Sequence, residues 1–224
     1  MSIKDALVRI PAGSATIEGA LRLPPHPGGL VLFAHGSGSS RHSLRNNFVA
    51  RVLNAGGLAT LLMDLLTPEE ARDYALRFDI GLLTARLAAA AAWAKEDGRT
   101  RGLPLGFFGA STGAAAALRA AAATTDAAAV VSRGGRPDLA GEALARVRAP
   151  VLLIVGGADR GVVELNEAAF ARLRCPKELV VVPGATHLFE EPGTLEKAAE
   201  HAAGWFKTHL AAAITTTQVK ENRP

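Results

Sequence analysis

Short apolar runs alternate with helical patterns along most of the chain. The apolar runs, which have the length and composition of buried strands, are 30–34, 59–63, 105–108, 127–132, 151–155 and 178–182. The segments with helical patterns between and after them are 43–54, 78–96, 112–123, 138–147, 163–174 and 194–210. Strands separated by helices predict an α/β protein with a doubly wound, mostly parallel sheet and helices on both faces.

The two ends of the chain have different patterns. Residues 6–11 and 15–23 read as two extended segments joined by a tight turn, which predicts a hairpin that opens the sheet. No internal repeat or linker divides the chain, so residues 1–212 are expected to form a single domain. Residues 213–224 carry three threonines and late charges and are expected to form a flexible tail. The longest irregular stretch, 65–74, is too short for a large lid.

A glycine-bracketed serine lies between a predicted strand and a helix of small residues. Gly109-Ala-Ser-Thr-Gly113 follows the strand 105–108 directly and precedes the alanine-rich segment 114–123. A chance match is the alternative in a chain with 23 glycines, but the strand before and the helix after are the context that a G-x-S-x-G nucleophile elbow requires. Ser111 is therefore the candidate nucleophile.

A serine nucleophile needs a base and an acid to orient that base. Asp159 follows the apolar run 151–155, and His187 follows the run 178–182, so both come after Ser111 in the order Ser, Asp, His. Separately, Asp159 reads as a helix cap or turn residue and His187 as a loop histidine. Together their strand-end positions predict a triad at the carboxyl edge of the sheet, where ligands of such folds bind. Glu190 is the next candidate for the orienting acid.

Two backbone N–H groups are candidates for stabilising the oxyanion. One belongs to Thr112, the residue after the nucleophile, and the other to Ser37, in the loop that follows the strand 30–34. His35, which ends that strand, is expected to have a structural role, in which its hydrogen bonds shape the turn that follows. A phosphate cradle is an alternative for the glycine- and serine-rich residues 36–40, but they have neither a GK[ST] ending nor G-x-G-x-x-G spacing.

Two arginines follow the strand after the elbow helix, on the same predicted edge. Arg133 or Arg136 could clamp a substrate carboxylate. The alternative is that an arginine pairs with Asp138 or bonds loop carbonyls.

Composition narrows the possible partners. Hydrophobic residues make up 49% of the chain and charged residues 21%, which is typical of globular proteins. The net charge is +4, but the basic residues are scattered with no basic run that interleaves aromatics, so nucleic-acid binding is not expected. No apolar run reaches a membrane-spanning length, the first residues lack signal-peptide features, and Cys175 is the single cysteine. These features predict a cytoplasmic protein with no membrane partner, and they leave its oligomeric state open.

Four motifs carry a resemblance to a known family: His35-Gly-Ser-Gly38, Gly109-Ala-Ser-Thr-Gly113, Gly156-Gly-Ala-Asp159 and Gly184-Ala-Thr-His187. With them the chain resembles an α/β-hydrolase of the dienelactone hydrolase type over roughly residues 6–210. The resemblance implies a hydrolase of small esters or lactones with no metal or organic cofactor. Dienelactone hydrolases themselves use cysteine as nucleophile, so a serine here favours general carboxylesterase chemistry. Similar domains also occur fused to phosphoribosyltransferase domains, but nothing in this chain resembles such a partner.

The expected reaction is serine-dependent hydrolysis of a small-molecule ester or lactone. His187 would take the Ser111 proton, the alkoxide would attack the carbonyl, and the Ser37 and Thr112 amides would hold the oxyanion. Two alternatives stay open. One is acyl transfer or thioester cleavage by the same triad, and the other is a hydrolase-like domain that binds a ligand without turnover.

Overall fold

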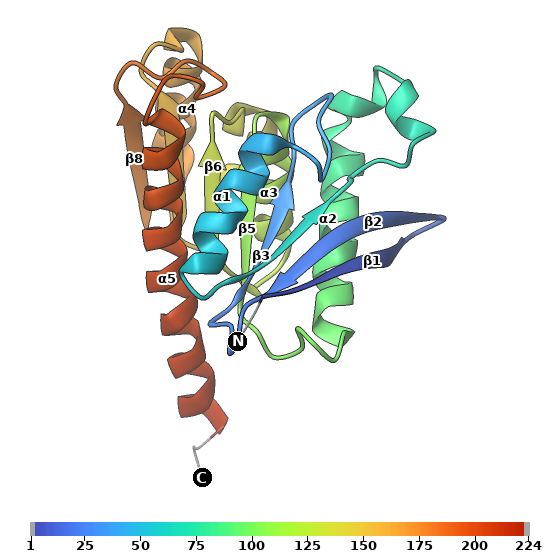
Figure 1. Ribbon diagram of the computed structural model, residues 1–224. Helices are drawn as coiled ribbons and strands as arrows, with labels where there is room; N and C mark the ends of the chain where they lie inside the picture. The colour runs from blue at the N-terminus through green and yellow to red at the C-terminus, as the bar shows by residue number, and fades with distance from the viewer. Residues whose placement is uncertain (1–2, 222–224) are drawn as a thin grey trace.

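A single eight-stranded sheet forms the centre of the computed structural model, which describes residues 3–221, with side chains described through residue 213. The strands in chain order are β1 (Lys4–Ala12), β2 (Ala15–Leu23), β3 (Leu30–Ala34), β4 (Ala59–Met63), β5 (Leu105–Ala110), β6 (Ala127–Arg133), β7 (Val151–Gly156) and β8 (Lys177–Val182). Their spatial order is β1-β2-β4-β3-β5-β6-β7-β8 (Figure 1). The pairs β1–β2 and β2–β4 are antiparallel and the other five pairs are parallel, which confirms the predicted sheet.

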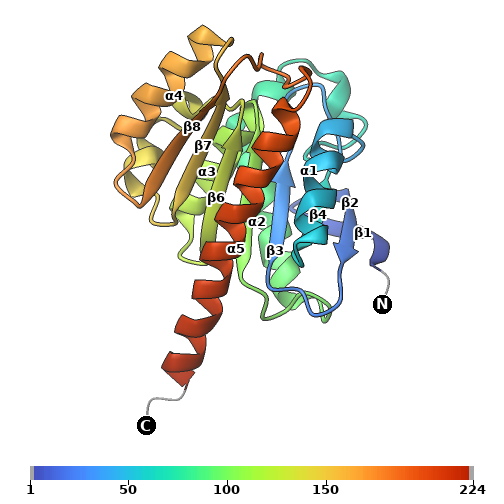
Figure 2. The same ribbon diagram turned by 60° about the vertical axis from the view of Figure 1, so that its left-hand side comes forward.

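Helices cover both faces of the sheet (Figure 2). The α-helices are α1 (Leu44–Ala55), α2 (Ile80–Glu96), α3 (Thr112–Ala123), α4 (Arg160–Arg172) and α5 (Thr194–Glu221). Helices α1 and α5 pack together on one face, and α2, α3 and α4 lie on the other. Because both faces are covered, the central strands are buried on both sides and read as continuous apolar runs.

The side chains of β3 alternate between the hydrophobic cores on the two faces of the sheet. Leu30, Leu32 and Ala34 point into the core under α2 and α3, whereas Val31 and Phe33 point into the core under α1 and α5. All five side chains are at most 1% exposed. Burying each large apolar side chain contributes about 1.5–3 kcal/mol, so this alternation holds both helix layers to the sheet.

The structure differs from the predicted elements in two segments. The helix expected at 138–147 is instead a 3₁₀ segment, η3 (Pro137–Arg146), interrupted where Gly141 has a φ of 60°. A left-handed residue cannot continue an α-helix, so this prediction was wrong in type. The last helix continues to Glu221 instead of ending near residue 210. Residues 213–221 of the expected tail are therefore helical, residues 222–224 lie outside the described residues, and the flexibility of this segment stays a prediction.

The order of the strands fixes where a ligand site can form. The chain runs from β3 outward to β4, crosses back to β5, and then proceeds in the other direction to β8. This reversal creates a crevice between the carboxyl ends of β3 and β5, the position at which open α/β sheets bind ligands. The connection from β4 to α2 forms only two short 3₁₀ turns, η1 (Glu70–Arg72) and η2 (Leu76–Phe78), and no large lid covers this edge in the described residues.

Candidate active site

Ser111 sits at the sharp turn between β5 and α3. Its backbone has φ 51° and ψ −125°, a conformation that costs a non-glycine residue of order 1–3 kcal/mol and is found mainly at functional sites. The two flanking glycines allow this turn. A Cβ on Gly109 would overlap the backbone of Ala114, and one on Gly113 would overlap the carbonyls that end β3. The elbow predicted at residues 109–113 is therefore present in its strand–turn–helix context.

The loop after β3 comes directly against the nucleophile. A Cβ on Gly36 would lie 2.8 Å from the Ser111 Cβ, so only glycine fits there without displacement. The Ser37 N–H, expected to face the oxyanion, donates a 3.0 Å hydrogen bond to the hydroxyl of Thr112. Thr112 is the first residue of α3, where the backbone N–H has no acceptor within the helix. The two predicted donors, the N–H groups of Ser37 and Thr112, are therefore close together. The Ser37 N–H already has a hydrogen-bond acceptor, the Thr112 hydroxyl.

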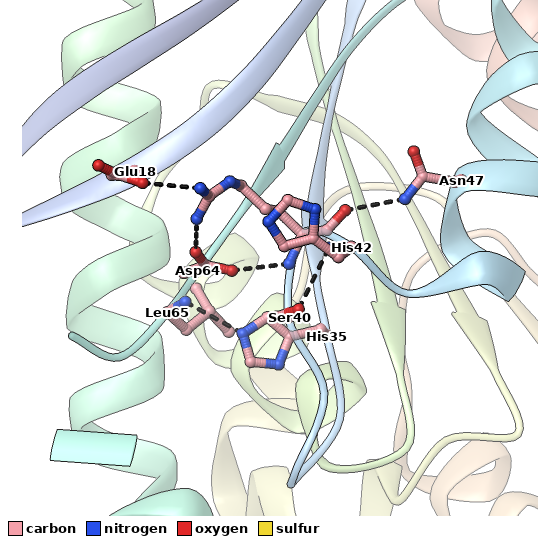
Figure 3. Close-up of polar contacts among 8 residues, drawn as sticks. Glu18, His35, Ser40, His42, Asn47, Asp64 and Leu65 are labelled. Carbon is pink, nitrogen blue, oxygen red and sulfur yellow. Dashed lines mark hydrogen bonds and ion pairs between the residues drawn. The ribbon is translucent and has the colours of Figure 1, made fainter. Parts of the chain in front are cut away.

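His35 holds this loop in place, as the sequence predicts. The Leu65 N–H donates to His35 Nε2 at 3.1 Å (Figure 3). Nδ1 therefore carries the hydrogen and donates to the Gly36 carbonyl at 2.9 Å. Burial lowers the pKa of His35, which keeps the ring neutral and in this tautomer. The ring therefore ties the Gly36 turn to the end of β4.

Asp64, at the end of β4, belongs to a separate polar cluster. Its carboxylate accepts hydrogen bonds from the backbone and the guanidinium of Arg41, and Arg41 also pairs with Glu18 at 2.7 Å (Figure 3). This cluster fixes the far end of the loop at residues 35–42 to β2 and β4. Asp64 is therefore engaged away from the candidate base.

The candidate acid and base are joined directly. His187 Nδ1 lies 2.7 Å from Asp159 Oδ2, and both residues follow strands, β8 and β7, at the carboxyl edge. Asp159 occupies the N-cap position of α4 but makes no side-chain capping bond, so its carboxylate serves His187 instead. Glu190, the second candidate acid, pairs with Arg45 at 3.0 Å. Glu191 bonds the backbone and hydroxyl of Thr186, and these bonds lower the pKa of Glu191.

Ser111 and His187 line one cavity of about 250 Å³. Its other walls include Ser37, Arg45, Asn46 and Arg133. Among the hydrogen bonds of the described residues, none joins Ser111 to His187. The structure thus brings the nucleophile and the Asp159–His187 pair to the same cavity without a direct bond between them.

The two candidate arginines have different surroundings. Arg136 makes a two-pronged ion pair with Asp138, at 2.9 and 2.8 Å, which is the structural alternative that the sequence allowed. Arg133 is only 7% exposed and lies in the cavity wall. Arg45 and Asn46 line the same cavity and were not foreseen, because nothing in the sequence distinguishes them from other polar residues of α1.

A second cavity of about 260 Å³ lies on the other side of the same loop. Its walls include Leu66, Pro68, Ala71 and Leu83, and Gly36, Ser37 and Ser39 line both cavities. Across the described side chains, no cluster of three or more histidine, cysteine or acidic residues is arranged to hold a metal ion. None of the described helices is long and apolar enough to cross a membrane.

The chain is similar to proteins that share this architecture. Residues 63–212 match the model of the dienelactone hydrolase family. The crystal structure of a dienelactone hydrolase from Anabaena variabilis is 52% identical, with a TM-score of 0.91 over 92% of this chain and 98% of that one. The esterase domain of a Rhodothermus marinus protein has the same fold, with a TM-score of 0.74 over 94% of this chain and all of that one, at 21% identity.

A longer relative matches along nearly the whole chain. A Mycobacterium tuberculosis protein named "Putative phosphoribosyl transferase" is 57% identical over 209 residues, which is 93% of this chain and 47% of that protein. The chain thus spans about half the length of this curated relative. Because the family model covers well over half of the chain, and the Anabaena structure matches nearly all of it, the chain belongs to the dienelactone hydrolase family.

Proposed function

We propose that the chain is a serine hydrolase that cleaves small carboxylic esters or lactones through an acyl-enzyme intermediate. Ser111 is the nucleophile, His187 is the general base and then the general acid, and Asp159 orients the imidazole. Membership of the family supports a hydrolase, Ser111 and His187 line one cavity, and Asp159 bonds His187.

The observation that carries this proposal is the 2.7 Å contact between His187 and Asp159 in a site whose cavity also contains Ser111. A carboxylate at Nδ1 favours the tautomer that leaves Nε2 unprotonated, so Nε2 can accept the serine proton. The serine oxygen then bonds to the carbonyl carbon. Collapse of the tetrahedral intermediate releases the alcohol, which takes its proton from His187, and a water deprotonated by His187 releases the acid.

The oxyanion would be held by the backbone N–H groups of Thr112 and Ser37. Donors of this kind, already in place before reaction, are each worth about 2.7–4 kcal/mol in related chemistry. The Ser37 N–H has a hydroxyl partner in the free enzyme. We infer that the substrate oxygen replaces the Thr112 hydroxyl as its acceptor, since the charged oxygen forms the stronger hydrogen bond.

The two cavities beside the loop suggest the size of the substrate. Each has a volume close to 250 Å³, below the usual range of about 300–1,000 Å³ for drug-sized ligands. An ester with a small acyl group and a small alcohol fits two such spaces on either side of the Ser37 amide. The apolar walls of the second cavity favour an uncharged group against them, because its two charged wall residues, Asp64 and Arg77, already bond Arg41 and the Ala71 carbonyl.

The transferase named in the longer relative is not proposed for this chain. That protein is about twice as long as the matched region, whereas the Anabaena dienelactone hydrolase matches end to end.

Hydrolysis of short p-nitrophenyl esters by the wild-type chain and by Ser111→Ala tests the proposal. Turnover should be lost in Ser111→Ala and retained in Ser14→Ala, a matched change in the exposed turn between β1 and β2. Undiminished turnover in Ser111→Ala would exclude this mechanism.

A further inference from the structure

The β6–η3 loop, residues 134–136, holds the backbone of the nucleophile. The Arg136 N–H donates to the Ser111 carbonyl at 3.0 Å, and the Ser111 N–H donates at 3.4 Å to the carbonyl of Arg133, the last residue of β6. Both backbone polar groups of Ser111 are therefore bonded to this part of the chain. Because Ser111 has a strained φ of 51°, bonds from its surroundings must hold that conformation in place.

The same loop contacts the candidate base. The Gly134 N–H donates to the Ile154 carbonyl of β7 at 2.8 Å, which fixes the start of the loop to the sheet. A Cβ on Gly134 would lie 2.9 Å from the His187 carbonyl oxygen, so the two backbones are packed closely together. The loop thus lies against both Ser111 and His187, which line one cavity without a direct bond. A shift of this loop would change the distance between them.

A buried side chain of α4 bonds the loop. Asn166 is fully buried, and its Nδ2 donates to the Gly135 carbonyl at 3.1 Å and to the Val162 carbonyl, one turn back in the helix, at 2.7 Å. Among the described side chains, Asn166 is the one that bonds the backbone of residues 134–136. Its Oδ1 is buried and has no hydrogen-bond partner, which is costly, so stability alone does not explain an amide at this position.

Helix α4 also carries the acid of the proposed triad. Asp159 is the N-cap residue of α4, and Asn166 lies seven positions later, about two turns along the helix. Asp159 contacts His187 at 2.7 Å, whereas Asn166 bonds the loop that holds Ser111. The first half of α4 is therefore bonded to the base at one point and to the support of the nucleophile at another.

We propose that Asn166 is a positioning residue of the hydrolytic site: by holding the Gly135 carbonyl, it sets where the β6–η3 loop places Ser111 relative to His187. Asn166 bonds neither of these two residues and does not line their cavity, so it acts through the loop. The consequence for the rate rests on the proposed function, whereas the hold of Asn166 on the loop does not require that Ser111 reacts.

Asn166→Thr removes the bond to the loop and keeps the bond within the helix. The two side chains have similar volumes, and a threonine hydroxyl inside a helix bonds the carbonyl four residues back, here that of Val162. With a short p-nitrophenyl ester, kcat should fall about ten- to hundredfold, because a misplacement of about 1 Å in a reacting group can cost about 10²-fold. KM should change little, because Asn166 does not line the cavity.

Asn54→Thr is the matched control. Asn54 is also a buried helical asparagine, and its Nδ2 donates to a loop carbonyl, that of Leu58, at 2.9 Å. It lies where α1 leads into β4, at the opposite edge of the sheet from Ser111. At temperatures well below the Tm of each variant, Asn54→Thr should keep the kcat of the wild type. A purely structural role for Asn166 would give Asn166→Thr the same behaviour, a lower Tm with an unchanged kcat.

Amide hydrogen exchange, followed by NMR, tests the hold on the loop without any substrate. The Arg136 N–H, which bonds the Ser111 carbonyl, should exchange about three- to tenfold faster in Asn166→Thr than in the wild type, as expected when one supporting hydrogen bond is lost. Its exchange should be unchanged in Asn54→Thr.

The outcomes are distinct. If Asn166→Thr speeds exchange at Arg136 but the wild type hydrolyses no ester, Asn166 holds the loop as inferred and the proposed function fails. If the wild type hydrolyses esters and Asn166→Thr keeps its kcat, a positioning role for Asn166 is excluded, whatever the exchange. A lower kcat with unchanged exchange at Arg136 would also exclude it, because the effect would not pass through the loop. Should Asn166→Thr not fold, Asn166→Leu, which has a similar size and no donor, gives the same comparison.

Discussion

At the scale of single residues, the chemistry of the site depends on which polar atoms are already engaged. Asp159 occupies the N-cap position of α4, but its side chain makes no capping hydrogen bond and bonds His187 instead. Asp64 and Glu190, two other acids near the same edge, are held by Arg41 and Arg45. Among these three carboxylates, Asp159 alone bonds the candidate base.

Replacing Asp159 by asparagine should lower kcat by about 10³- to 10⁴-fold, because the amide favours the histidine tautomer that cannot accept the serine proton. KM should change little, since Asp159 bonds His187 and does not line the cavity. Steady-state kinetics on a short p-nitrophenyl ester measures both quantities. Glu190→Gln is the matched control and should stay close to wild type. An Asp159→Asn enzyme within a few-fold of wild type would mean that the orienting acid is elsewhere.

His35 gives the fold a dependence on pH. Burial lowers the pKa of His35 in the folded state, so as pH falls below about 6.5 the unfolded chain takes up a proton that the folded chain does not. Stability from this group is present above that pH and is lost as the pH falls. His35→Gln keeps an acceptor for the Leu65 N–H but does not titrate.

Between pH 8 and pH 5 the free energy of unfolding, measured with urea, should therefore fall more for the wild type than for His35→Gln. The pKa of His209 is also lowered by burial, but its contribution is common to both proteins and cancels. An equal loss in both proteins would show that His35 does not contribute to the acid sensitivity.

The sequence identifies the residues of the site that have distinctive positions. Ser111, Asp159 and His187 each follow a strand and occur in the order that an α/β-hydrolase requires. The bond between the Ser37 N–H and the Thr112 hydroxyl joins residues 75 positions apart and depends on the exact approach of β3 to α3. Asn46 and Arg45 can be recognised as residues of the cavity only when the position of α1 over the sheet edge is known.

At the scale of elements, the elbow depends on the close approach of α3 to β3 and β5. Gly113 lies in the first turn of α3 against the carbonyls of Ala34 and His35, and neither backbone group can move away without shifting β3. The close packing of Gly113 against the end of β3 therefore fixes the position of Ser111 relative to that strand.

Gly113→Ala should destabilise the protein by about 1–3 kcal/mol, the usual cost of overpacking. It should also lower kcat, because β3 leads into the loop that holds Ser37, the proposed oxyanion donor. Urea unfolding and ester hydrolysis measure the two effects. Gly204→Ala in α5 is the matched control, since a Cβ there meets nothing within 4 Å and should stabilise the helix by up to about 1 kcal/mol. A Gly113→Ala protein as stable and active as wild type would contradict the described packing.

Most elements could be predicted because the strands β3 to β7 are mainly apolar and each helix is bounded by loop residues. The bounds of β2, β3, β4 and α3 match those expected. The segment at residues 137–146 could not be predicted, because its alanines and leucines favour an α-helix while the left-handed Gly141 breaks it. Its structure follows from packing against α3 and α4, which the local sequence does not encode.

At the scale of the whole molecule, the reversal of strand order gathers the site between β3 and β5 and leaves it bounded by short connections. Neither the β4–α2 connection nor the β6–η3 loop is long enough to build a deep acyl tunnel. The two adjoining cavities, each near 250 Å³, are the space in which we propose that the substrate binds.

Among p-nitrophenyl esters of increasing length, kcat/KM should peak at acyl chains of about two to six carbons and fall for longer ones. A tunnel would contribute up to about 0.8 kcal/mol per added methylene and raise the rate steadily with chain length. A rate that climbs to twelve or more carbons would reveal an acyl pocket that the described residues do not form.

Labelling with a fluorophosphonate, which reacts with a serine only when a base activates it, tests directly whether Ser111 is an activated nucleophile. We expect one adduct per chain, mapped by mass spectrometry to Ser111, absent from Ser111→Ala and much slower to form in Asp159→Asn. A folded protein that resists the probe, or an adduct at another residue, would contradict the assignment of Ser111 as the activated nucleophile.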